Sequence, residues 1–450
     1  MKRLAILSIV CALFYGEAIC QPQNITEIDH LMNLFSPEPG TREAAFEFVE
    51  QGWSPSYLMP VLEVAYLHKN PEISDRLIQL ISRKTGRYYG VDFNKWHQWI
   101  WNRDIANIDH YADFKARLYV HLDKKFYKYF AGRYENDIRL DEIRWGGVVQ
   151  DGIPPLRSPV MTKADEVQYL ADTDIVFGVA INGDVRAYPK RILAWHELFT
   201  DQVGGLEVAG VYCTLCGSMI LYNTTVDGTN YRLGTSGFLY RSNKLMYDEA
   251  TQSLWSTLLG EPVVGPLTGR GILLESLSVV TTTWGEWKSR HPETTVLSLH
   301  TGYARDYREG IAYGDYFATD ELMFATPFKN RKLRNKQEVL ALRFPQNPAL
   351  PLAISTRFLD KNPIFHEQLG NIQFVVITDP SGANRVYETD GTKFTFFDGQ
   401  NLLQDENGVS WRLEEGQLVS STGKVLDKLP YHRAFWFGWY AAFPHTQLIK

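Results

Sequence analysis

The chain has 450 residues, of which 44% are hydrophobic and 13% aromatic, and its formal net charge is −6. This length is enough for two or three domains with sizeable hydrophobic cores. The acidic balance, together with the lack of a strongly basic block, gives no electrostatic support for nucleic-acid binding, so we expect no nucleic-acid partner.

The N-terminus has the pattern of an export signal. A charged start at residues 1–3 precedes an apolar run at residues 4–15. This pattern predicts a secretory signal peptide over residues 1–20, cleaved near Ala18 or Cys20. A lipid anchor on Cys20 is the less favoured alternative, because the three preceding residues make a poor lipobox. No later stretch reaches transmembrane length, so we expect a secreted or periplasmic protein with no transmembrane span in the mature chain.

Residues 21–138 are predicted to form an α-helical domain. Apolar residues recur at helical spacing over 41–50, 57–68 and 72–82, with Pro or Gly between these segments. Short antiparallel helices would bury such stripes against one another. The aromatic residues that follow, from 96 to 130, are interpreted as core.

The sequence pattern over residues 139–335 predicts short β-strands separated by turns, so the predicted fold class is α+β. Residues 175–181 and 185–189 flank an Asn-Gly-Asp turn and predict a β-hairpin. A short helix is expected over residues 190–199. A strand over residues 207–212 then leads directly to Cys213.

Cys213 and Cys216 lie in C-x-x-C spacing, and they are the two cysteines outside the leader. A thioredoxin-type site needs the second cysteine on a helix, whose N-terminus lowers the thiol pKa. Here the β-forming run at residues 219–222 follows instead. The pair is therefore interpreted as a metal-binding turn or a local disulfide.

Several short motifs in this region resemble those of one family, the largely bacterial domain of unknown function 3179 (DUF3179). The resemblance covers roughly residues 145–330 and is expected to extend to the C-terminus. It implies the β-rich fold and the domain boundaries, and it brings no established biochemistry with it. The motifs that carry it are Tyr188-Pro189, Ile192 to Glu197, Tyr212 to Cys216, Gly234 to Gly237, Asn243, Met246-Tyr247-Asp248 and Ser253-Leu254-Trp255.

Residues 336–450 are predicted to be a degenerate second copy of the β-rich domain. Turn and tryptophan motifs of the first copy recur in the same order, for example Trp284 to Trp287 and Trp436 to Trp439. Where the first copy has its two cysteines, the second has Thr378 to Ser381. Because the predicted β-strands of the second copy form without these cysteines, the fold does not require them. The cysteines of the first copy are therefore expected to belong to a functional site.

The leading functional hypothesis is metal binding, or metal-linked redox chemistry, at Cys213 and Cys216 with His196 as a third ligand. Two thiolates supply half of a zinc site, and thiolates with imidazole suit Cu or Zn; the sequence selects neither metal. Further residues are expected to line the site: Glu197, Arg241, Asn243, Met246, Asp248 and Trp255.

Three alternatives stay open at this point. A disulfide between such close cysteines can be strained and redox-active. Cys213 with His196 could be a nucleophile and its base, which would make the protein a Cys/His-dependent enzyme. The chain could also be a non-catalytic extracellular binding module with a structural disulfide. Whether the protein is an enzyme, and what its partners are, is left open by the sequence.

Overall fold

The computed structural model describes residues 26–132 and 134–450. The expected signal peptide and Cys20 lie outside these residues. The chain divides into two compact units, one ending at Trp53 and the other spanning Ser54–Lys450. In the first unit, the helices are α1 (Glu27–Asn33) and α2 (Pro39–Gln51). The Thr26 side chain caps α1 in a reciprocal pair with Asp29.

The second unit begins with short helices, as the helical periodicity predicts. Asn70 caps the longest of them, and Gly86 ends it at a φ of +67°, a left-handed conformation that suits glycine. Lys115 forms a fully buried ion pair with Glu63, with 2.5 Å between Nζ and Oε1, so two of these helices are joined by charge as well as by apolar packing. The helices are α3 (Leu58–Leu67), α4 (Pro71–Thr85), α5 (Phe93–Trp101), α6 (Tyr111–Tyr119) and α7 (Tyr127–Phe130).

Mostly antiparallel sheets follow from Ile143 onward, with parallel pairs between β5 and β17, β19 and β29, and β2 and β6, which confirms a mixed α+β architecture. The predicted hairpin at residues 175–189 is formed by β4 and β5. One sheet has the order β16-β4-β5-β17-β3: β3 (Met161–Lys163), β4 (Ile175–Ile181), β5 (Asp184–Pro189), β16 (Val280–Thr283) and β17 (Thr295–Leu297).

Two further sheets surround the cysteine turn. The first has the order β15-β8-β7-β6-β2: β2 (Leu156–Arg157), β6 (Leu198–Val203), β7 (Leu206–Cys213), β8 (Ser218–Asn223) and β15 (Glu275–Leu277). The second has the order β1-β11-β12-β13-β14: β1 (Ile143–Trp145), β11 (Leu233–Tyr240), β12 (Asn243–Asp248), β13 (Leu254–Ser256) and β14 (Pro262–Val264). A small hairpin, β9 (Thr225–Val226) with β10 (Thr229–Asn230), turns at Asp227-Gly228.

The last part of the chain is also β-rich. Its sheet β28-β18-β19-β29 consists of β18 (Glu338–Leu342), β19 (Leu352–Ser355), β28 (His432–Phe435) and β29 (Gln447–Ile449). Beside it lie β20 (Ile364–Leu369), β21 (Ile372–Thr378) and β22 (Asn384–Glu388). The outermost sheet runs in chain order through β23 (Phe394–Phe397), β24 (Leu402–Asp405), β25 (Ser410–Leu413), β26 (Gln417–Ser420) and β27 (Val425–Asp427).

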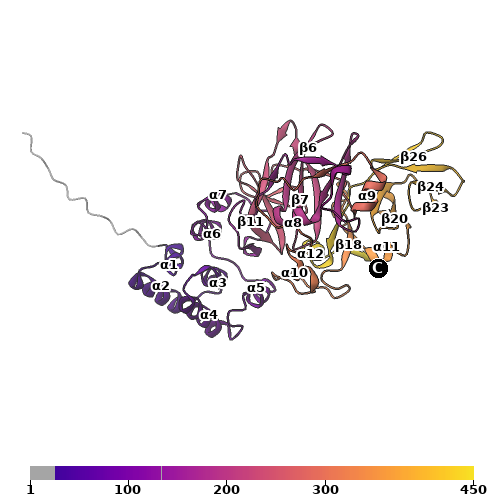
Figure 1. The fold of residues 1–450 in the computed structure, drawn as a ribbon. Helices are drawn as coiled ribbons and strands as arrows, with labels where there is room; N and C mark the ends of the chain where they lie inside the picture. The colour runs from indigo at the N-terminus through magenta and orange to yellow at the C-terminus, as the bar shows by residue number, and fades with distance from the viewer. Residues whose placement is uncertain (1–25, 133) are drawn as a thin grey trace, which may run out of the picture. The chain divides into compact units, whose positions relative to one another are not determined.

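Short helices lie among these sheets (Figure 1), and the last of them contributes Trp436 and Trp439 to a core cluster that the sheets share. Trp255 of the earlier strands and Trp436 of the C-terminal part belong to the same buried cluster, together with Val339 and Ala434. The β-rich parts before and after residue 336 are therefore packed as one body. These helices are α8 (Lys190–His196), α9 (Trp284–Arg290), α10 (Gly314–Ala318), α11 (Thr356–Leu359) and α12 (Trp436–Ala442). Across the described residues, none of the helices combines the length and apolar character needed to span a membrane.

Candidate functional site

The two cysteines lie on a tight turn between antiparallel strands. Cys213 ends β7 and pairs with Ser218, the first residue of β8. The Cys216 N–H donates to the Cys213 carbonyl oxygen at 3.2 Å, and Gly217 turns the chain with a φ of +59°. The expectation that a strand, rather than a helix, follows the second cysteine is confirmed. The helix dipole that activates thioredoxin-type thiols does not act here.

Cys213 faces a small cavity of about 60 Å³. Glu197, Lys244 and Tyr313 line the same cavity, and its remaining wall is largely apolar. Only 2% of Cys213 is exposed to solvent. A cavity of this size admits a few water-sized groups and excludes a folded protein substrate.

The environment of Cys213 favours its thiolate. A hydrogen bond from the Cys216 side chain lowers the pKa of Cys213, and the backbone N–H groups of Lys244 and Cys216 act in the same direction. Burial and the negative charge of Glu197 oppose this effect but do not cancel it. Cys213 is therefore the more acidic thiol of the pair.

Cys216 lies behind Cys213 and has no exposed surface. Its Sγ is 3.1 Å from the Ser242 carbonyl oxygen, so its S–H has two acceptors in reach, this oxygen and the sulfur of Cys213. Burial, followed by the neighbouring Cys213, raises the pKa of Cys216 well above its ordinary value. Gly438 of α12 packs against it, since a Cβ at Gly438 would lie 3.1 Å from the Cys216 Sγ. Both cysteines are free thiols in this structure.

A buried ion pair borders the cavity. Lys244 Nζ lies 2.6 Å from Glu197 Oε2, and the two side chains are 6% and 9% exposed. The other Glu197 oxygen accepts hydrogen bonds from the Thr214 hydroxyl at 2.7 Å and the Tyr313 hydroxyl at 3.1 Å. Glu197 ends α8 with a φ of +57°, which is uncommon for a residue other than glycine and often marks a functional position. The carboxylate is thus held in one orientation between the cation and two hydroxyls.

The structure does not bring His196 to the sulfurs. Its Nδ1 lies 2.8 Å from the Pro154 carbonyl oxygen, and its Nε2 lies 2.6 Å from the Tyr307 hydroxyl. A carbonyl oxygen can only accept, so Nδ1 donates, and Nε2 of the neutral ring accepts from Tyr307. Burial lowers the pKa of His196, which keeps the ring neutral at pH 7. Both nitrogens therefore have partners other than the thiols.

The metal-ligand set expected from the sequence is not assembled in this geometry. Within residues 26–132 and 134–450, no group of three or more His, Cys, Asp and Glu side chains is arranged to hold a metal ion. A tetrahedral zinc site needs four ligands, or three and a water. At the turn, the two sulfurs are the donors in place, because the Glu197 oxygens are already bound.

The other residues expected to line the site fall into two groups. Asn243 lies near the thiols, since its Nδ2 donates to the Gly438 carbonyl oxygen at 3.0 Å. Arg241 pairs instead with Glu142. The other three residues are structural. Met246 and Trp255 are buried in the shared hydrophobic cluster. Asp248 accepts hydrogen bonds from the turn that follows it and from Trp255 Nε1, the latter at 3.2 Å.

Sequence reasoning missed Lys244, Thr214 and Tyr313, which all contact Glu197. Lys244 lies in a β-strand that is buried from end to end, a property that its polar residues do not reveal in the sequence. Buried lysines are rare without a partner, so the pair with Glu197 becomes expected once the burial of the strand is known.

Comparison with known proteins identifies a family that covers the thiol turn. A family model described as "Protein of unknown function (DUF3179)" matches residues 150–446. The match includes the thiol turn and the C-terminal sheets, so the resemblance does extend past residue 330. No curated protein matches the chain. No solved structure matches it either.

Proposed function

The chain belongs to the family of proteins of unknown function DUF3179, and because membership brings no activity with it, we propose one from the thiol turn. We propose that the protein is a dithiol redox protein in which Cys213 reacts with a small oxidant and Cys216 resolves the product. The observation that supports this most is the asymmetry of the pair. Cys213 has a lowered pKa and faces a cavity, whereas Cys216 is sealed behind it with a raised pKa.

A hydroperoxide is the class of oxidant that fits a cavity of this size. The Cys213 thiolate attacks the peroxide, an S–O bond forms, the O–O bond breaks, and the leaving oxygen takes a proton to become water or an alcohol. Cys213 is now a sulfenic acid. The Cys216 sulfur attacks the Cys213 sulfur, an S–S bond forms, the S–O bond breaks, and the hydroxide leaves as water with the Cys216 proton. Two thiol groups of an external reductant then reduce the disulfide: the first forms a mixed disulfide and frees one cysteine, and the second frees the other cysteine and leaves the reductant as a disulfide.

The experiment oxidises reduced protein with hydrogen peroxide and identifies the products by mass spectrometry. The background is a variant with Cys11→Ser and Cys20→Ser, so that leader thiols do not contribute. We expect a Cys213–Cys216 disulfide in this background, a trapped sulfenic acid at Cys213 in Cys216→Ser, and no oxidation at neutral pH in Cys213→Ser. Oxidation of Cys216 in the Cys213→Ser variant, or no reaction of Cys213, would contradict the assignment of roles.

The pH dependence gives a separate prediction. Because hydrogen bonding lowers the pKa of Cys213, the first thiolate should form below the ordinary cysteine range as pH rises, and Cys216 should ionise only at much higher pH. Replacing Cys216 with Ala removes the largest cause of this lowering, so the Cys213 midpoint should move to higher pH. Ultraviolet absorbance of the thiolate measures both midpoints. An unchanged midpoint in Cys216→Ala would show that the side-chain hydrogen bond has no such effect.

Metal binding at the same pair, the expectation from the sequence, is the second candidate. Two soft sulfurs, with backbone N–H groups that stabilise the Cys213 thiolate, suit a soft ion such as Cu(I) better than zinc, which would need ligands beyond those in place. Elemental analysis of the purified protein tests it. Stoichiometric copper that is lost in both Cys→Ser variants would favour this candidate over peroxide chemistry.

We also infer that residues 336–450 are a degenerate second copy of the β-rich domain. The order β16-β4-β5-β17 corresponds to β28-β18-β19-β29, with the same strand directions in each sheet. A Trp–Thr hydrogen bond recurs after the corresponding helices, from Trp287 to Thr294 at 3.1 Å and from Trp439 to Thr446 at 2.9 Å. In this alignment the thiol turn corresponds to the turn after β21. An experimental structure in which the two sheets fail to superpose would contradict the duplication.

Export from the cytoplasm belongs to the same proposal and is supported by the charged and apolar start of the sequence. The intact mass of the protein from its native source tests it. We expect a chain that begins just after Ala18 or near Cys20. A full-length chain that starts at Met1 would contradict a cleaved signal peptide.

A further inference from the structure

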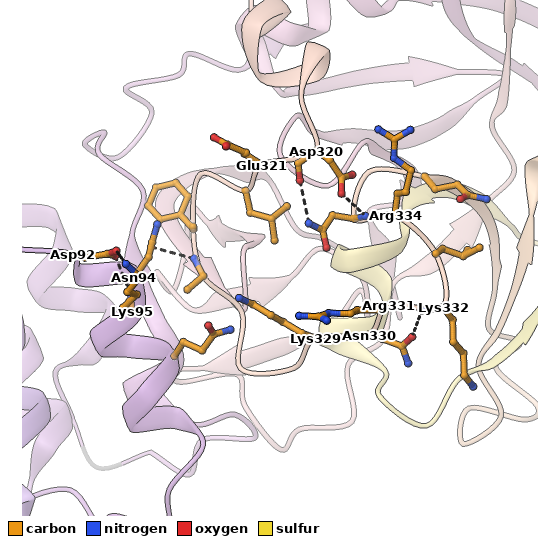
Figure 2. A pocket seen from close by; sticks show the side chains of 17 residues that line it. Asp92, Asn94, Lys95, Asp320, Glu321, Lys329, Asn330, Arg331, Lys332 and Arg334 are labelled. Carbon is orange, nitrogen blue, oxygen red and sulfur yellow. Dashed lines mark hydrogen bonds and ion pairs between the residues drawn. The ribbon is translucent and has the colours of Figure 1, made fainter. Parts of the chain in front are cut away.

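A large cleft lies on the second unit, and one of its residues, Phe324, also lines the small cavity at Cys213. It has a volume of about 1020 Å³, and it is bounded by the start of α5 and by the irregular segment of residues 320–337 (Figure 2). The wall is held by side-chain amides. Asn94 accepts from the Ala325 N–H and donates to the Met323 carbonyl oxygen, both at 3.1 Å, and Gln98 donates to the Thr326 carbonyl oxygen at 3.2 Å. The cleft is therefore a built feature of the fold.

Four cations line this cleft. Lys329, Arg331, Lys332 and Arg334 are all exposed, and within the described residues none of them forms an ion pair. All four fall within six consecutive positions, residues 329–334, in a chain whose net charge is −6. Such a cluster creates a local positive potential that attracts anions.

The nearby acids do not neutralise these cations. Asp92 pairs with Lys95 at 3.0 Å. Asp320 accepts from the backbone N–H groups of Asn335 at 3.2 Å and Lys336 at 2.9 Å, which orients its carboxylate but leaves its negative charge in place. The lining still has five basic side chains against three acidic ones. Glu321 is exposed on the wall and has room to bind a ligand hydroxyl.

We propose that this cleft binds an anionic polysaccharide, with the four cations on the acidic groups of the sugar chain. Guanidinium groups bind carboxylates in a bidentate manner, which gives Arg331 and Arg334 the leading roles. The Asn330 Oδ1 accepts from the Lys332 N–H at 2.8 Å, which leaves its Nδ2 group, together with the Glu321 carboxylate, as polar partners for sugar hydroxyls. A nucleic acid fits less well, because the described lining holds one aromatic side chain, Phe324, where base stacking requires a row of them.

The test uses oligomers of polygalacturonate as the probe and isothermal titration calorimetry as the measurement. The variant is Arg331→Gln with Arg334→Gln, and its matched control is Arg87→Gln with Arg357→Gln, which removes the same charge from exposed sites elsewhere. We expect about tenfold weaker binding in the first variant, from the loss of two charge-assisted contacts, and unchanged binding in the control. Binding should also weaken with added salt.

Four results would overturn the proposal. The first is no binding of the probe to the unaltered protein, and the second is an equal loss of binding in both variants. The third is equal binding of the fully methyl-esterified polymer, which carries no charge. The fourth is tighter binding of a single-stranded oligonucleotide that depends on Arg331 and Arg334. Unfolding midpoints of both variants establish that the fold is intact, and because no cysteine is involved, the outcome is independent of the thiol chemistry.

Discussion

Replacing Lys244 with Met is expected to lower the free energy of unfolding by about 3–5 kcal/mol. The substitution leaves the Glu197 carboxylate buried without its cation, 2.6 Å from where the ammonium group lay. Urea unfolding followed by tryptophan fluorescence measures the effect. The double variant Lys244→Met with Glu197→Gln should recover most of the loss, because it removes both charges.

The control for this prediction is Lys361→Met, which changes an exposed lysine at the surface. Its effect should stay within about 0.5 kcal/mol. If the Lys244 variant were as stable as this control, the pair would be solvated in solution and would not hold the cavity wall. A double variant less stable than Lys244→Met alone would lead to the same conclusion.

Replacing Trp436 with Ala is expected to cost about 3–5 kcal/mol, and Trp255→Ala should cost a similar amount. Both indoles are fully buried in the cluster that the earlier and later β-rich parts share. Because the core is common, each variant should lower the midpoint of the same cooperative transition. Urea unfolding followed by circular dichroism and by fluorescence measures this. Two separated transitions, with only one affected by each variant, would show that the two parts fold independently; Phe396→Ala, at an exposed strand position, is the matched control.

The strands and turns were the most predictable part of the fold. The hairpin at residues 175–189 and the strand–turn–strand around Cys213 follow from β-forming residues, their spacing and turn chemistry, which act locally. The partner of a buried charge is not local. Lys244 and Glu197 come from different elements, so no spacing rule connects them.

The backbone conformation of Glu197 decides which of two neighbouring side chains faces the cavity at the thiols. His196 and Glu197 are adjacent, and the sequence places both equally near the turn. Glu197 leaves the helix in a left-handed conformation, which sends its carboxylate towards Lys244, while His196 turns to Pro154 and Tyr307. A positive φ at a glutamate has no sequence signature. The cations of the cleft were missed for a related reason. The net charge of the whole chain is negative, and this average hides the four basic residues within residues 329–334.

The contact between Gly438 and the Cys216 sulfur has an evolutionary consequence. If the C-terminal segment of residues 336–450 arose as a copy, it lacks the cysteines of the first copy yet still closes the back of that cysteine pair. Any larger side chain at Gly438 would press on the Cys216 sulfur, so selection on the thiol turn would act on a residue some two hundred positions away. The two copies would then evolve together, and an exchange of one between relatives would require its counterpart.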